Sequence, residues 1–148
     1  MPLSRKCARP DCLIRLEPWL ARLRTLRAML LLCLACAVVA LIPFKSWRGW
    51  LGGKAGAGSD PVRARRHAAQ IERAARRMPV RVKCLPQAMA LSWQLRQRGT
   101  AHRIVFAVRP PGHRKTDDTL HAWIECQDRI VLGELPGPWM PVFELPER

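Results

Sequence analysis

A cysteine and a histidine are the two residues of this chain whose types and positions could perform chemistry together. Residues 84–99 read CLPQAMALSWQLRQRG and predict a short helix, because Pro86 suits a first helical turn and Gly99 suits a helix end. Cys84 opens this predicted helix. The partial positive charge of a helix N-terminus favours the thiolate, which is the nucleophilic form of cysteine.

The histidine lies on a predicted strand. Residues 120–126 read LHAWIEC and alternate as a half-buried strand does. One face then carries Leu120, Ala122, Ile124 and Cys126, and the other carries His121, Trp123 and Glu125. If His121 faces Cys84, its imidazole can take the thiol proton and later protonate a leaving amine. This is the chemistry of cysteine peptidases and related acyl-transfer enzymes.

Each of these two residues alone is a weak signal, because cysteines and histidines are often simply buried in a core. Their order along the chain strengthens it. Residues 103–108 predict a strand before the histidine strand, and residues 129–132 predict a strand after it, joined by a short turn at Gln127 and Asp128. The order of a helix with Cys84, a strand, the strand with His121 and then a carboxylate beyond a hairpin favours a catalytic core over two unrelated buried residues.

Three strings in this half of the chain resemble a known family. They are Cys84-Leu85-Pro86-Gln87-Ala88, Leu95-Arg96-Gln97-Arg98-Gly99 and His121-Ala122-Trp123-Ile124-Glu125, with a looser likeness at Ile42-Pro43-Phe44. They are similar to the transglutaminase-like cysteine peptidases of lasso-peptide biosynthesis, also called microcin-processing proteins. The likeness covers most of residues 20–135.

That resemblance implies an α+β fold of the papain or transglutaminase type, with helices packed on a small antiparallel sheet. It implies a peptidase that removes the leader from a ribosomal precursor peptide, after which a separate cyclase forms the macrolactam. It further implies that a separate small leader-recognition protein presents the precursor peptide. We expect no cofactor, and no metal site, because Cys7 and Cys12 would need two further ligands that no nearby histidine supplies.

Carried over to this sequence, the resemblance assigns Cys84 as the nucleophile and His121 as the general base. The family places an aspartate shortly after the second hairpin strand, whereas this chain has Glu134 at that point. Glu134 is therefore the first expectation for the residue that orients the imidazole. Glu125 and Asp128 are the alternatives. Trp123 could line the cleft or pack in the core.

The N-terminal half is basic and then apolar. Leucines recur at helical spacing in residues 1–27, with Pro18 expected to interrupt the helix, and residues 28–44 form an apolar run that Pro43 ends. This run is at the short limit of a membrane span, and the competing interpretation is a helix buried in the protein or lying against a membrane. We expect a cytoplasmic protein, and the sequence leaves open whether residues 28–44 attach it to the inner membrane.

Composition suggests three segments. We expect a basic and hydrophobic helical segment over residues 1–51, a glycine-rich linker over residues 52–59 and a catalytic domain over residues 60–148. The domain begins with a helix capped by Asp60 that has one apolar stripe and an arginine-rich face. The segment from Gly133 contains four prolines and is expected to be irregular.

Charge and cysteine usage narrow the function classes. A net charge of +15 attracts acidic partners, but the basic runs carry few aromatic residues and no zinc-finger spacing, so nucleic acid is not expected. The six cysteines show no disulfide framework. The leading hypothesis is the leader peptidase. The alternatives are a transglutaminase-like acyl transferase and a non-catalytic basic protein associated with a membrane.

Overall fold

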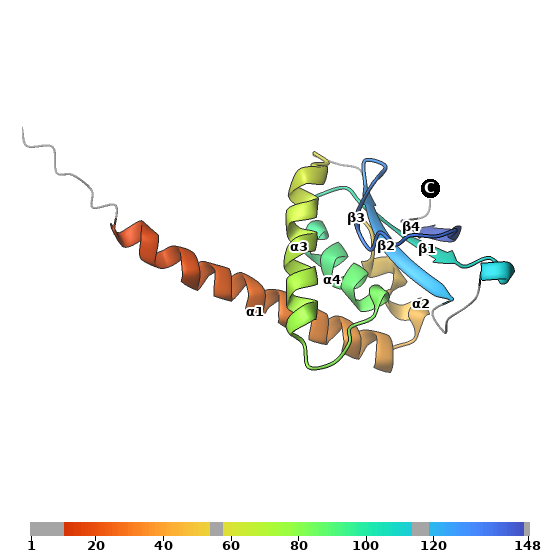
Figure 1. Cartoon of the computed structure of the whole chain (residues 1–148), viewed down its shortest axis with the longest axis horizontal. Coiled ribbons are helices and arrows are strands. Elements are labelled where there is room, and N and C mark those ends of the chain that lie inside the picture. The colour runs from red at the N-terminus through yellow and green to blue at the C-terminus, as the bar shows by residue number, and fades with distance from the viewer. Residues whose placement is uncertain (1–10, 54–57, 114–118, 147–148) are drawn as a thin grey trace, which may run out of the picture.

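A four-stranded antiparallel sheet, covered on one face by helices, forms the body of the protein (Figure 1). The computed structural model describes residues 11–53, 58–113 and 119–146, and for residues 11–18 and His113 it describes the backbone alone. The elements are α1 (Asp11–Leu41), α2 (Phe44–Trp47), η1 (Arg48–Trp50), α3 (Pro61–Arg77), α4 (Cys84–Arg96), β1 (Arg103–Val108), η2 (Pro111–His113), β2 (Leu120–Cys126), β3 (Arg129–Leu132) and β4 (Met140–Leu145). The predicted α+β class is confirmed.

The strands lie in the order β3-β2-β1-β4. The predicted hairpin of β2 and β3 forms, and both residues of its turn, Gln127 and Asp128, have positive φ angles of 50° and 58°. A two-residue turn in which both φ angles are positive matches the right-handed twist of the flanking strands. The alternation along β2 is also as expected, because Ala122, Ile124 and Cys126 join the core under the helices while Trp123 packs on the opposite face of the sheet.

The segment after Gly133 corrects one prediction. Four prolines suggested an irregular chain, yet β4 pairs with β1 in antiparallel register. It does so as an edge strand, where a proline without an N–H group is tolerated. Pro141 lies opposite Ala107, next to a shift in register between Phe106 and Ala107. The expectation of irregular structure was therefore wrong for this strand.

The N-terminal half is one long helix. α1 continues through Pro18, where a break was expected, and the chain turns only at Pro43. Its later turns pack against α3 and α4, whereas its first half extends away from the body (Figure 1). By length and composition alone, Trp19–Leu41 could cross a membrane, with a mean hydropathy of 2.0, although core helices of soluble proteins also meet that standard.

α3 forms as its sequence predicts. The Asp60 carboxylate accepts hydrogen bonds from the N–H groups of Val62 and Arg63, both at 3.0 Å, and Pro61 occupies the first helical position. The buried face consists of small residues and one isoleucine: Ala64, Ala68, Ile71 and Ala74. The exposed face carries six arginines: Arg63, Arg65, Arg66, Arg73, Arg76 and Arg77.

Residues at the start of the expected linker are held in the fold. The N–H of Gly52 donates to Ser92 Oγ at 3.0 Å, and the N–H of Gly53 donates to the carbonyl of His102 at 3.1 Å. Ser92 and His102 are themselves buried and hydrogen bonded to each other at 2.8 Å. These bonds tie the chain before α3 to α4 and to the residues that precede β1. Residues 54–57 of the expected linker lie outside the described residues.

Candidate active site

Cys84 approaches β2 at an open edge of the sheet. β3 pairs only with residues 124–126 of β2, so the first half of β2 has no neighbour on that side among the described strands. α4 packs against β2, and the Cys84 thiol hydrogen bonds with the imidazole of His121 and with the backbone N–H of Ala122. The fold thus brings a helix N-terminal cysteine into direct contact with a strand histidine.

The contacts of Cys84 favour its thiolate. Burial alone would raise the pKa of the thiol, but the net pKa lies below the ordinary value. The hydrogen bond with His121 is the largest lowering effect, followed by the N–H of Ala122, the charge of His121 and the N–H of Leu85. A lower pKa increases the fraction of nucleophilic thiolate at neutral pH.

The contacts of His121 favour its protonated form. Burial lowers the pKa of the imidazole, but the hydrogen bonds with Cys84 and Gly133 and the charge of Cys84 raise it above its ordinary value. His121 Nε2 lies 2.6 Å from the carbonyl oxygen of Gly133. A carbonyl oxygen only accepts, so Nε2 carries a proton. In the neutral imidazole, Nδ1 is then free to accept the thiol proton.

The carbonyl that orients His121 depends on a glycine. Gly133 follows β3 directly and has φ +86°, a conformation that L-residues with a side chain rarely adopt. A Cβ placed there would lie 3.0 Å from the carbonyl oxygen of Ala122 and 3.1 Å from Cβ of Trp123. Only a residue without a side chain lets the backbone approach β2 closely enough to present its carbonyl to His121.

A family comparison agrees with this geometry. The family model described as the transglutaminase-like superfamily matches residues 18–141. The chain belongs to the transglutaminase-like superfamily. Members of this superfamily are generally cysteine hydrolases or transferases. No curated protein and no solved structure matches the chain. Because the match begins at residue 18, it includes most of α1 in the transglutaminase-like domain.

None of the three carboxylates considered from the sequence contacts His121 in this transglutaminase-like domain. Glu134 is exposed, and its neighbour Gly133 makes the contact through its backbone carbonyl. Glu125 accepts hydrogen bonds from Trp123 Nε1 at 2.7 Å and from Arg103 Nε at 2.7 Å. The structure therefore brings together Cys84 and His121 and leaves Glu134 outside the pair.

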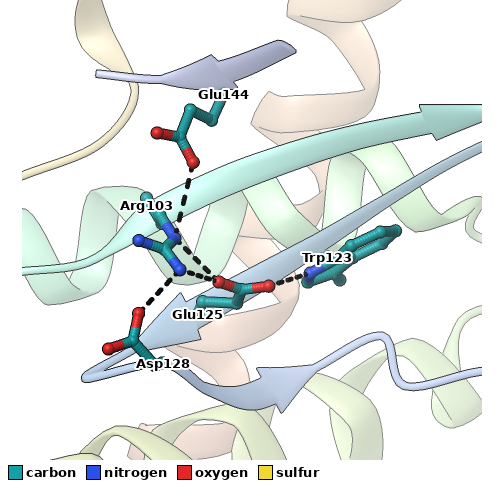
Figure 2. Close-up of polar contacts among 5 residues, drawn as sticks. All are labelled: Arg103, Trp123, Glu125, Asp128 and Glu144. Carbon is teal, nitrogen blue, oxygen red and sulfur yellow. Dashed lines mark hydrogen bonds and ion pairs between the residues drawn. The ribbon is translucent and has the colours of Figure 1, made fainter. Parts of the chain in front are cut away.

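Glu125 and Asp128 belong to a separate ion-pair network (Figure 2). The guanidinium of Arg103 binds Glu125 and Asp128 at 2.6 and 2.8 Å and lies 3.5 Å from Glu144. These contacts link β1, β2, the hairpin turn and β4. The network holds the Glu125 carboxylate beside Trp123, whose indole N–H points to it (Figure 2). Its effect on the active site is therefore to fix the strand and the tryptophan next to His121.

Two tryptophans enclose the imidazole. The ring centroid of His121 is 5.0 Å from that of Trp139 and 6.0 Å from that of Trp123, and the exposed fraction of His121 is 6%. The guanidinium of Arg109 lies over Trp139, 4.5 Å from its centroid. Trp123 was considered from the sequence as a wall of the cleft, whereas Trp139, Arg109 and Gly133 were not singled out. Trp139 lies in the proline-rich segment that was expected to be irregular, so the sequence did not place it near His121. For Gly133, the available signal was a glycine directly after a predicted strand.

The start of α4 also offers a donor for a developing oxyanion. The first N–H groups of a helix have no acceptor within the helix, and Lys83 provides no side-chain cap. Pro86 has no N–H and the Leu85 N–H donates to the Cys84 thiol, which leaves the backbone N–H of Cys84 as the donor at this end. Oriented N–H groups stabilise the negative oxygen of a tetrahedral intermediate. Among the described residues, no group of three or more His, Cys, Asp or Glu side chains could hold a metal ion.

We expect the Glu134→Gln variant to retain activity within about twofold, because the carboxylate is exposed and does not contact His121. An orienting carboxylate would instead lose on the order of 10⁴-fold in turnover when changed to its amide. Turnover of a peptide substrate, measured for the variant and the wild type, separates these outcomes. A loss of turnover of roughly a hundredfold or more would show that the Glu134 carboxylate takes part in catalysis.

The pH dependence of thiol alkylation should report the Cys84–His121 contact. The pKa of Cys84 is lowered, so its reaction with iodoacetamide should persist at a pH where an ordinary thiol is protonated and slow. In the His121→Ala variant this pKa should rise, because burial then acts without the hydrogen bond and charge of the imidazole. Peptide mass mapping of Cys84 across a pH series measures both profiles. Identical profiles would contradict the contact.

Proposed function

We propose that this transglutaminase-like protein is a cysteine peptidase that removes the leader from a ribosomal precursor peptide during lasso-peptide biosynthesis of the microcin type. The observation that carries the proposal is the direct contact between the Cys84 thiol and the His121 imidazole. Superfamily membership supports the hydrolase or transferase class. The resemblance of the strings at Cys84 and His121 supports the choice of leader removal within that class.

The site provides each step of peptide hydrolysis. His121 Nδ1 takes the proton of Cys84, and the thiolate attacks the scissile carbonyl carbon to form a tetrahedral intermediate. The backbone N–H of Cys84 stabilises its oxyanion. The imidazolium then protonates the leaving amine as the C–N bond breaks, which leaves a thioester on Cys84. Water, deprotonated by the same imidazole, hydrolyses the thioester and releases the acid.

The Gly133 carbonyl contributes by holding the ring in one tautomer. A hydrogen bond from Nε2 to this carbonyl keeps Nδ1 directed at the thiol through both proton transfers. A neutral carbonyl stabilises an imidazolium less than a carboxylate does, because it carries no formal charge. In this chain the charge of the thiolate itself is the main anionic partner of His121.

The proposed substrate is a leader-bearing precursor peptide in the cytoplasm. We propose that a separate small leader-recognition protein presents this peptide and that a macrolactam-forming cyclase uses the released core. The exposed arginines of α3 and the net charge of +15 favour acidic peptide segments over basic ones as partners. No cofactor is required for the hydrolysis described above.

The experiment combines purified protein, a candidate precursor and a candidate leader-recognition protein, and follows peptide masses. Hydrolysis predicts two products, whose masses sum to that of the precursor plus one water. An acyl transferase, which is the alternative within this superfamily, would instead form an amide with an added amine and release the other fragment without gaining water. An unchanged precursor in the presence of a verified leader-recognition partner would contradict the proposed function.

A further inference from the structure

The outer face of α1 forms a continuous apolar stripe, which we call the outer stripe. Its members recur every three or four residues and are all exposed: Trp19, Leu23, Leu26, Leu30, Leu34, Ala37 and Leu41. At 1.5 Å per residue the stripe is about 33 Å long. The exposed fractions of Leu30 and Leu41 are 70% and 81%. Exposed apolar surface of this extent marks an interaction site.

From Ala28 onward, the opposite face of α1 is already occupied. Ala28, Leu32, Ala35 and Val38 are buried in the same core as Ile71 of α3 and other residues of α3 and α4. Leu32 and Ala35 have no exposed surface. If α1 crossed a bilayer by itself, it would have to leave this core and expose the facing surfaces of α3 and α4.

If α1 instead crossed a bilayer with its neighbours attached, charged groups would enter the hydrocarbon. Arg77 of α3 lies 3.5 Å from Thr25 of α1, and Arg27 of α1 lies 2.5 Å from Gln97 just beyond α4. Each arginine placed at a bilayer centre costs at least about 2.5 kcal/mol. The six exposed arginines of α3 would add to that cost. The packing of α1 therefore opposes a membrane-spanning orientation.

The groups around the outer stripe match the surface of an anionic membrane. Arg22 and Arg27 are exposed on α1 beside the outer stripe, and Lys45 and Arg48 are exposed just after the helix. Trp19 begins the stripe, and Trp50, which is half exposed, follows its end in sequence. Basic residues attract anionic headgroups, and tryptophans are favoured at the boundary between headgroups and acyl chains.

We propose that α1 lies flat on an anionic lipid bilayer, with the outer stripe inserted at the boundary between headgroups and acyl chains, and does not cross the membrane. An interfacial helix needs one apolar face and nearby basic residues, and α1 has both. Its other face packs against α3 and α4 of the transglutaminase-like domain. This inference is independent of the peptidase proposal, since it concerns where the domain resides and not what it cleaves.

The test is sedimentation of the full chain with vesicles of phosphatidylcholine alone or mixed with phosphatidylglycerol. The wild type should bind the anionic vesicles more tightly, and rising salt should weaken that binding. The double variant Leu30→Glu/Leu34→Glu should bind the anionic vesicles at least roughly tenfold more weakly. The matched control is Val62→Glu/Val80→Glu, which changes two equally exposed apolar residues outside α1 and should bind as the wild type does.

Unchanged circular dichroism of both variants shows that they remain folded. Equal binding by the outer-stripe variant and the control would overturn the proposal. So would equal binding of the wild type to both kinds of vesicle. Wild-type protein that resists alkaline carbonate extraction would show a spanning helix instead. A lipid-free dimer that the outer-stripe variant converts to monomer would show that a second copy covers this face.

Discussion

Replacing Cys84 by alanine is expected to abolish cleavage of the precursor while leaving the protein folded. The variant removes the nucleophile, and the remaining site can offer only oriented N–H donors and an imidazole. Loss of the nucleophile in a serine protease, which uses the same kind of nucleophile–histidine pair, lowers turnover by about 10⁶-fold. The measurement is the rate at which the precursor mass disappears, with excess enzyme and with the leader-recognition partner present.

Cys33→Ala provides the matched control for this variant. Cys33 is a free, exposed cysteine on α1, away from the contact with His121. Its substitution should leave cleavage unchanged. The turnover of His121→Ala should be almost as low as that of Cys84→Ala, because the effects of residues in one catalytic unit are not additive. Cleavage by Cys84→Ala at the wild-type rate would mean that another group performs the reaction.

Gly133→Ala is expected to reduce turnover by roughly tenfold to a hundredfold, which is the effect of losing a group that orients a functional imidazole. The added Cβ would meet the Ala122 carbonyl oxygen at 3.0 Å, so the chain after β3 must shift. The carbonyl then moves away from His121 Nε2, and the imidazole loses its fixed tautomer. Turnover and the pH profile of Cys84 alkylation, measured on the same sample, test this effect.

Gly99→Ala controls for backbone strain. Gly99 also has a positive φ, +64°, but an added Cβ there would meet no atom within 4 Å. Both substitutions should destabilise the fold by about 1 kcal/mol through the left-handed conformation. Only Gly133→Ala should also change the alkylation profile of Cys84. If the two variants have the same turnover and the same profile, the Gly133 carbonyl has no role in positioning His121.

Local patterns were sufficient to predict the elements that carry the catalytic pair. Pro86 and Gly99 bracket the helix of Cys84, and Asp60 with Pro61 begins α3, because caps and prolines act within one or two turns. β1 has the bounds expected from its apolar residues, Arg103–Val108. The contact between Cys84 and His121 was expected only from their order and from the family resemblance, since it joins elements distant in sequence.

The prediction failed where tertiary position overrides local preference. Pro141 argues against a strand in general, but an edge strand does not need its N–H. The group that orients His121 is the Gly133 backbone carbonyl, which no side-chain motif can reveal. Glu134 was chosen because motifs describe side chains, whereas the close approach of Gly133 to β2 determines which acceptor reaches the ring.

The most direct test of the account is which of the six cysteines reacts first with limiting iodoacetamide at neutral pH, as determined by peptide mass mapping. Cys33 is exposed and Cys84 is half-buried, so accessibility alone would favour Cys33. The contact with His121 predicts that Cys84 reacts first, because its pKa is lowered. Labelling of Cys33 ahead of Cys84 would contradict an activated thiol in the proposed active site.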